Sequence, residues 1–176
     1  LGFAMATGIL YGRFSRPKAK LIFSNNALIS PYQEGKGLMV RLANQKDSQI
    51  IEVRADMFFS YMDKEDQGGT RKFYNLPLEL QRINMLATSW TLVHPLDSES
   101  PLESLTQEDL RNSDCELIIQ IQGFDVTYGQ QVNTRTSFKG EEFVWGAKFI
   151  RILGADESGR ATVKLDQISE FNKVEV

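Results

Sequence analysis

Few side chains in this sequence have the type and spacing of a catalytic site. The single histidine, His94, is followed closely by Asp97 and Ser98, which together supply the three groups of a hydrolytic triad. A triad must converge around an oxyanion-stabilising site, and three side chains on one tight turn cannot do so. The spacing therefore favours a structural histidine at the end of a strand, and we expect that the chain is not an enzyme.

The sequence also lacks the patterns that hold metals, nucleotides or redox centres. Its single cysteine, Cys115, has no second thiol with which to form an internal disulfide or a paired metal site. Phosphate-binding glycine loops and the His-Glu-x-x-His pattern do not occur. The acids between Asp63 and Asp66 lack EF-hand spacing and are interpreted as a solvated hairpin tip. We expect no metal site and no cofactor.

The strongest chemical signal is a group of cations beside an apolar segment. Residues 1–12 carry no charge, and four cations follow within eight residues: Arg13, Arg16, Lys18 and Lys20. An anionic membrane surface attracts such cations at about 1 kcal/mol each. The apolar run is shorter than the roughly 20 residues of a membrane-spanning helix, so we interpret it as the end of a longer one. A buried soluble helix or a disordered tag is the alternative.

Pro17 divides the chain, because proline lacks an amide donor and disfavours helix at the residue before it. We expect a membrane-helix end at 1–14, a linker at 15–24 and one folded domain at 25–176. A chain of 176 residues is long enough for one well-cored domain with an appendage. The net charge of −3 gives no general nucleic-acid footprint, so nucleic acid is not an expected partner.

Short strands separated by turn signals dominate the rest of the sequence. Alternation over 51–59 predicts one inward set, Ile51, Val53, Ala55, Met57 and Phe59, and one outward set, Glu52, Arg54, Asp56 and Phe58. In the same way, Ile119 and Ile121 are expected inward, and Gln120 and Gln122 outward. A loop is expected between Gly123 and Gly129. Further strands are expected at 20–24, 27–30, 38–43, 71–76, 90–94, 134–138, 142–145, 148–153 and 161–165.

Two capping signals, at Ser100 and Thr106, predict one or two short helices. Many short strands with little helix indicate an all-β fold, which we interpret as an immunoglobulin-like antiparallel β-sandwich.

Several dispersed motifs resemble one family. They are Arg16-Pro17-Lys18, the run Ile22 to Ala27, the run His94 to Leu102, the run Thr134 to Phe138, and Val144-Trp145-Gly146. In order and spacing they resemble the inward-rectifier potassium channels, especially the prokaryotic members, over about Gly8 to the C-terminus.

This resemblance implies the cytoplasmic end of a pore-lining helix, a linker and an intracellular gating domain. Four copies would form a homotetramer at the cell membrane, with the sandwich in the cytoplasm extending the path of the potassium ion. Binding of an anionic phospholipid of the inner leaflet, or of another ligand, would be coupled to channel opening. The alternative from the residues alone is a soluble immunoglobulin-like sandwich that acts as a carrier or chaperone-type binding module.

The resemblance also assigns roles to individual residues. It implies lipid contact for the four cations from Arg13 to Lys20, although Ala19 stands where eukaryotic members have lysine. Glu52 matches an acidic pore-lining position that attracts cations, including polyamine or magnesium blockers. Gln122 stands where strongly rectifying members have a second acid, which implies weaker block. Gly123 and Phe124, through to Gly129, match the loop that narrows the cytoplasmic pore.

Overall fold

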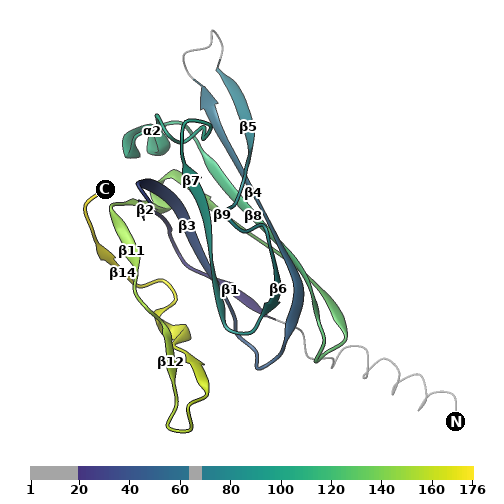
Figure 1. The fold of residues 1–176 in the computed structure, drawn as a ribbon. Helices are drawn as coiled ribbons and strands as arrows, with labels where there is room; N and C mark the ends of the chain where they lie inside the picture. Colours follow the sequence, from purple (N-terminus) through teal and green to yellow (C-terminus); the bar gives the residue numbers. More distant parts are fainter. Residues whose placement is uncertain (1–19, 64–68) are drawn as a thin grey trace, which may run out of the picture.

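Two five-stranded sheets share one apolar core in the computed structural model, which describes residues 20–63 and 69–176 (Figure 1). The strands of the first sheet are β1 (Leu21–Phe23), β2 (Ala27–Tyr32), β3 (Gly35–Asn44), β7 (Ser89–Leu96) and β10 (Phe143–Trp145). Those of the second are β4 (Ile50–Asp63), β5 (Thr70–Leu76), β6 (Arg82–Leu86), β8 (Glu116–Asp125) and β9 (Gln130–Lys139). The first sheet has the order β1-β3-β2-β10 with β7 on β3, and the second has β5-β4-β8-β9 with β6 on β4.

The core forms where the alternating apolar faces of these sheets meet. The second sheet buries Val53, Ala55, Met57 and Phe59 of β4, as predicted, together with Ile119 and Ile121 of β8. The first sheet contributes Ile29, Leu38, Val40, Leu42 and Leu92 to the same cluster. Burying a side chain of this size stabilises a fold by about 1.5–3 kcal/mol, so this shared core accounts for most of the attraction between the sheets. The mainly β-strand prediction is confirmed.

The helix prediction is confirmed at one of its two positions. Helix α2 (Gln107–Asn112) begins after Thr106, whose hydroxyl accepts a hydrogen bond from the Asp109 amide at 3.2 Å. The Asp109 carboxylate in turn accepts from the Thr106 amide at 2.8 Å, which completes a capping box. The residues after Ser100 form only turns, although the Ser100 hydroxyl accepts from the Leu102 amide at 3.2 Å as a helix cap would.

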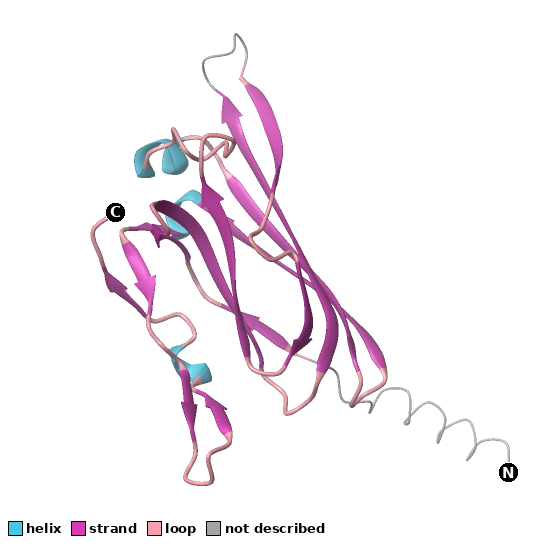
Figure 2. Ribbon diagram, in the orientation of Figure 1, coloured by secondary structure: helices cyan, strands magenta, loops and turns pink. Residues whose placement is uncertain are grey.

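The C-terminal part departs most from the sequence prediction. The strand expected at 148–153 is two strands, β11 (Ala147–Phe149) and β12 (Leu153–Ala155), because they pair with different partners, β14 (Phe171–Lys173) and β13 (Ala161–Val163). Strands β6 and β14 were not predicted at all. The short 3₁₀ helices η1 (Gly140–Glu142) and η2 (Leu165–Gln167) complete the order of elements. Figure 2 shows these short strands beside the two main sheets.

A second correction concerns strand direction. Strand β10 pairs in parallel with β2, through Phe143↔Ala27 and Trp145↔Ile29, whereas the other strand pairs among the described residues are antiparallel. The purely antiparallel prediction is therefore wrong at this pair. The connection from β2 to β10 spans most of the chain, so no local turn forces the two strands to run in opposite directions.

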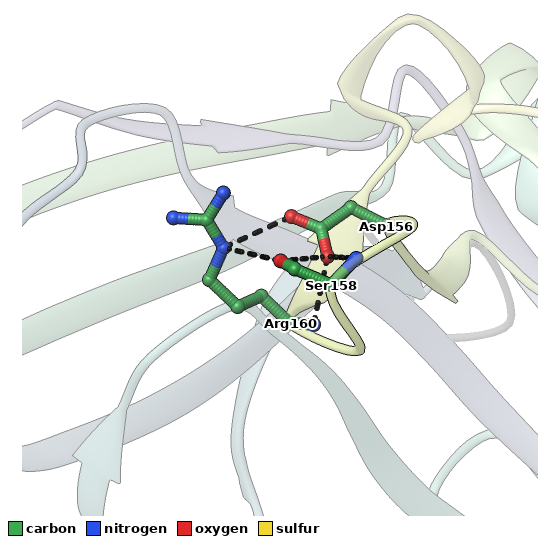
Figure 3. Close-up of polar contacts among 3 residues, drawn as sticks. All are labelled: Asp156, Ser158 and Arg160. Carbon is green, nitrogen blue, oxygen red and sulfur yellow. Dashed lines mark hydrogen bonds and ion pairs between the residues drawn. The ribbon is translucent and has the colours of Figure 1, made fainter.

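The turn between β12 and β13 is held by one acidic side chain (Figure 3). Asp156 accepts hydrogen bonds from the Ser158 hydroxyl at 2.6 Å and from Arg160 Nε at 3.0 Å. The bond from Ser158, with those from Arg160, lowers the pKa of Asp156. These contacts are exposed, and we assign them to the turn itself.

The predicted membrane-helix end at 1–14 lies outside the described residues, as does the first half of the predicted linker, 15–19. Within 20–63 and 69–176, no helix is both long and apolar enough to cross a bilayer.

Candidate functional site

Strand β4 contains a bulge at Glu52, the acidic residue singled out in the sequence. Its pairing with β8 passes from Ile51↔Phe124 directly to Arg54↔Gln122, so that two β4 residues lie opposite Gly123 alone. Glu52 has a φ of 51°, in the left-handed region that residues other than glycine rarely adopt.

The bulge also changes which side chains point inward. Ile50 is fully buried and Ile51 only half-buried, so the predicted inward position of Ile51 is wrong. Simple alternation assumes that each residue of a strand lies opposite one residue of its partner. A bulge adds one residue to β4, so on one side of the bulge the inward and outward positions are exchanged. Beyond the bulge, Val53 is buried, and Glu52 is exposed as predicted.

Gly123 lies inside a strand and not at the start of a loop. Strand β8 continues to Asp125, and the turn comprises only residues 126–129. A Cβ atom at Gly123 would lie 2.9 Å from Ile50 Cγ2 and 3.2 Å from the Ile51 carbonyl oxygen. The predicted start of the loop at Gly123 is therefore wrong, because β8 continues past it. The absence of a Cβ atom at Gly123 instead lets the bulged backbone of β4 pack closely against β8. Gly129, with a φ of 61°, does occupy a turn position that favours glycine.

The outer face of the second sheet is polar around the bulge. Glu52 and Gln122 are both exposed on adjacent strands, and Phe124 is half-buried. Arg54, also exposed, forms its ion pair with Asp56, with 2.9 Å between Nη2 and Oδ1. The Arg54 charge is thus bound by Asp56, and the Glu52 carboxylate faces solvent, where it can attract cations.

A buried hydrogen-bond network, which the sequence did not reveal, holds the turn after β8. Asp125 is fully buried. Its Oδ2 accepts from the Ser48 hydroxyl at 2.7 Å, and its Oδ1 accepts from the Tyr128 amide at 2.9 Å. Asn44 Nδ2 donates to the Ser48 carbonyl at 2.7 Å. These donors compensate the burial of the carboxylate and fasten the β8–β9 turn to the β3–β4 connection.

Lys20 is the only one of the four predicted lipid-binding cations within the described residues. It is exposed at the start of β1, and its carbonyl oxygen accepts from the Gln45 amide at 2.8 Å. It also lines a hollow of about 380 Å³ with Gln130 and Gln131 of β9. Lys20, within the predicted linker, therefore lies next to the strand that follows the 126–129 turn. Arg13, Arg16 and Lys18 lie outside the described residues.

His94 is held by neighbours other than the two that the sequence suggested. It is 2% exposed, with Nδ1 2.7 Å from the Pro77 carbonyl oxygen and Nε2 2.8 Å from Ser100 Oγ. A carbonyl only accepts, so Nδ1 carries the hydrogen and Nε2 accepts from Ser100. Burial lowers the pKa of His94, which favours the neutral ring. These contacts agree with a structural histidine.

Cys115 is equally unsuited to chemistry. It is buried, and burial raises the pKa of its thiol to about 11, so almost no reactive thiolate forms at neutral pH. In the part of the chain that the structure describes, no cluster of three or more His, Cys, Asp or Glu side chains could hold a metal ion.

A large apolar residue on the outward face of a predicted strand is a signal of a functional surface that the sequence does contain. Phe58 was placed on the wet face of β4, where a large apolar side chain is unexpected, and it is indeed 38% exposed. Ser48 and Asp125 gave no comparable signal, because polar residues near turns are common and their pairing joins positions far apart in the sequence.

Comparison with known proteins identifies the family. Residues 21–176 match the inward rectifier potassium channel C-terminal domain. The inward rectifier potassium channel Kirbac3.1 of Paramagnetospirillum magnetotacticum is 33% identical over 172 residues, which cover 97% of this chain and 58% of that relative. Inward rectifier potassium channel 4 of Homo sapiens is 28% identical over 166 residues, covering 86% of this chain and 36% of that protein.

The chain thus spans little more than half the length of its bacterial relative and about a third of the human one. The matched domain belongs to a family of ion channels, which confirms the expectation of a non-enzymatic protein. Both comparisons confirm the resemblance seen in the sequence, and the chain belongs to the inward rectifier potassium channel family, whose C-terminal domain it contains.

Proposed function

We propose that this chain is the cytoplasmic gating and pore-extension domain of a tetrameric inward-rectifier potassium channel. In this proposal, an anionic lipid or another ligand binds at the linker, and its binding is coupled to opening. Its immunoglobulin-like sandwich positions two parts, a wall that faces the ion path and a joint that meets the membrane. The observation that carries the proposal is the exposed acid at the β4 bulge, next to a turn that is fastened to the β3–β4 connection, which in turn is bonded to Lys20 of the linker.

The pore wall is the outer face around Glu52 and Gln122. Four copies around an axis would bring four Glu52 carboxylates to one ion path, raising the local concentration of potassium and of multivalent cations such as polyamines or magnesium. Gln122 adds no charge, so this wall should bind blocking cations more weakly than one with acids at both positions. The left-handed backbone at Glu52 supports this role, since such conformations cluster at functional sites.

The joint would act through three hydrogen bonds that are linked by the backbone between the adjacent residues Asn44 and Gln45. The Lys20 carbonyl is bonded to Gln45, the neighbouring Asn44 is bonded to Ser48, and Ser48 is bonded to the Asp125 that holds the turn. A displacement of the linker would therefore reach the turn beside the pore wall through short, directional contacts. A ligand that binds one conformation of the linker more tightly than the other would shift the channel between its closed and open states.

The pore wall can be tested in the complete channel that contains this chain. Glu52→Gln should reduce block by polyamines and magnesium and lower the inward potassium conductance, because four charges leave the ion path. Glu157→Gln removes an exposed acid from the turn between β12 and β13 and is the matched control. Current–voltage relations that are identical for Glu52→Gln and the unmodified channel would reject the pore role.

The joint can be tested by binding of the chain to liposomes that contain anionic phospholipid. The double variant Arg16→Gln, Lys18→Gln should bind about 30-fold more weakly, since each cation contributes about 1 kcal/mol. The control Arg151→Gln, Lys164→Gln removes the same charge from exposed positions of the C-terminal part. Equal losses in the two double variants would show that only net charge matters and would reject a specific lipid contact.

A further inference from the structure

Strand β1 packs against an apolar core on each of its two faces. Successive side chains of a strand point to opposite faces, and on β1 Leu21 and Phe23 pack against the main core while Ile22 packs against a second one. The second core has three buried residues: Ala43, Ile152 and Ile168. Two of them come from residues 147–173, which we call the C-terminal clamp. The C-terminal clamp therefore packs on the face of β1 that points away from the main core.

Polar contacts attach the C-terminal clamp to β1 and to its neighbour β3. Directly after β1, the Asn25 amide donates to Ser169 Oγ at 3.0 Å. On β3, Arg41 Nη2 donates to the Ile150 carbonyl oxygen at 2.8 Å, and its guanidinium carbon lies 4.5 Å from the centre of the Phe149 ring. These are the distances of ordinary hydrogen bonds and of a cation–π contact. The clamp is thus fixed to the pair of strands that directly follows the linker.

Arg41 makes this attachment weaker than a purely apolar one would be. The residue is only 7% exposed, yet within 20–63 and 69–176 it has no ion pair, and its Nη1 has no hydrogen-bond partner there. Burying a charge is costly unless the charge is paired and fully hydrogen-bonded. When the clamp moves away, water hydrates the guanidinium, and part of that cost is recovered. The buried charge therefore favours release of the clamp.

The C-terminal clamp also has little internal support. Its two sheets have two strands each, β11 with β14 and β12 with β13, and every strand is three residues long. Isolated two-stranded sheets are marginally stable in water, so the clamp depends on its contact with the sandwich. That contact is the small second core and the polar bonds beside it. Units of this kind open locally at a lower free energy than a main core does.

Strand β1 in turn depends on the clamp, because its own pairing is short. Within the described residues it pairs with β3 alone, over three residues. Release of the clamp would uncover Ile22 and break the bond at Asn25, leaving β1 with β3 and the main core only. Lys20 of the linker directly precedes this strand. The hold on the end of the linker therefore differs between the docked and the released clamp.

We propose that the C-terminal clamp is a releasable clamp on the linker strand β1, and that Arg41 keeps it releasable. With the clamp docked, β1 is held between two cores, so a displacement of the linker is passed to the sandwich. With the clamp released, β1 moves with the linker while the sandwich stays folded. Release itself is independent of the proposed function, and only its consequence for channel opening rests on that function.

Hydrogen exchange of the 176-residue chain, followed residue by residue with NMR, tests the clamp. The Ser24 amide, bonded to the Arg41 carbonyl at 2.8 Å, reports on how firmly β1 is held. The Ala55 amide, bonded to the Gln81 carbonyl at 3.0 Å, reports on the sandwich. Ile168→Ser should accelerate exchange at Ser24 about tenfold or more, because truncating a buried isoleucine loosens the second core. Exchange at Ala55 should not change.

Two further variants separate the second core from the buried charge. Leu153→Ser, at a 44% exposed residue of the same clamp, is the matched control and should leave exchange at Ser24 unchanged. Arg41→Met keeps an unbranched apolar stem and removes the charge. It should slow exchange at Ser24 about tenfold, because opening no longer hydrates a guanidinium. A residue that merely fastened the clamp would show faster exchange when replaced.

Faster exchange at Ser24 in Ile168→Ser, with Ala55 unchanged, and slower exchange in Arg41→Met would support the proposal. Equal acceleration at Ser24 and Ala55 would overturn it, by showing that the clamp and the sandwich open as one unit. An unchanged rate at Ser24 in Ile168→Ser would also overturn it, because β3 and the main core would then suffice to hold β1. Unchanged or faster exchange in Arg41→Met would overturn the role of the buried charge. The currents of Glu52→Gln test the proposed function separately from all of these results.

Discussion

Substituting Gly123 tests whether close packing against the bulge shapes the proposed pore wall. In Gly123→Ala, the new Cβ would lie 2.9 Å from Ile50 Cγ2 and 3.2 Å from the Ile51 carbonyl oxygen. The Ile50 side chain is fully buried, so it has little free space into which to rotate. The carbonyl belongs to the backbone that leads into Glu52, so relief of the second contact requires the bulge itself to move.

The size of the effect follows from this geometry. Adding a methyl group to a close-packed interior costs about 1–3 kcal/mol in the free energy of unfolding. With a urea dependence of about 1–3 kcal/mol per molar, the unfolding midpoint should fall by about 1 M. Amide chemical shifts at Ile51 and Glu52 should also change, because the displaced backbone carries both residues.

The matched control is Gly35→Ala at the start of β3. A Cβ atom there has no neighbour within 4 Å, so the substitution adds no contact. It should leave the midpoint unchanged or raise stability by about 0.5 kcal/mol, since alanine restricts the unfolded chain. Equal urea midpoints for the two variants would refute the reasoning, because they would show that the sheet accepts a side chain at the bulge without strain.

Two further predictions concern buried polar groups. Burial lowers the pKa of His94 below its ordinary 6.5, so the unfolded chain takes up this proton at a higher pH than the native one. The stability contributed by neutral His94 should be complete above pH 6.5 and should decline as the pH falls below it. The decline in the free energy of unfolding is at most about 1.4 kcal/mol per pH unit. Urea midpoints that decline equally in His94→Gln and in the unmodified chain would contradict this prediction. Asp125→Ala should cost about 1–3 kcal/mol, because it leaves the Ser48 hydroxyl and the Tyr128 amide without their acceptor. Hydrogen exchange at Tyr128 should accelerate in that variant, and an unchanged rate would show that the turn is held by other contacts.

Local patterns predicted those features that depend on local chemistry. Alternation placed Val53 to Phe59 correctly because each side of a regular strand meets one environment. The capping box at Thr106 was visible because both partners lie within four residues of each other. The motifs of the family were also readable from the sequence, since their order and spacing need no knowledge of the fold.

The sequence by itself therefore determined the strand-rich class, the family and the exposed position of Glu52. Only the tertiary structure decided the bulge at that residue, because a bulge depends on which strand lies opposite and how closely Gly123 lets it approach. It alone joined Ser48 to Asp125, which are 77 residues apart, and brought Phe58 together with Phe73 and Ile118 on one surface. These features arise from contacts between distant segments, whose pairing a local pattern of residue types does not specify.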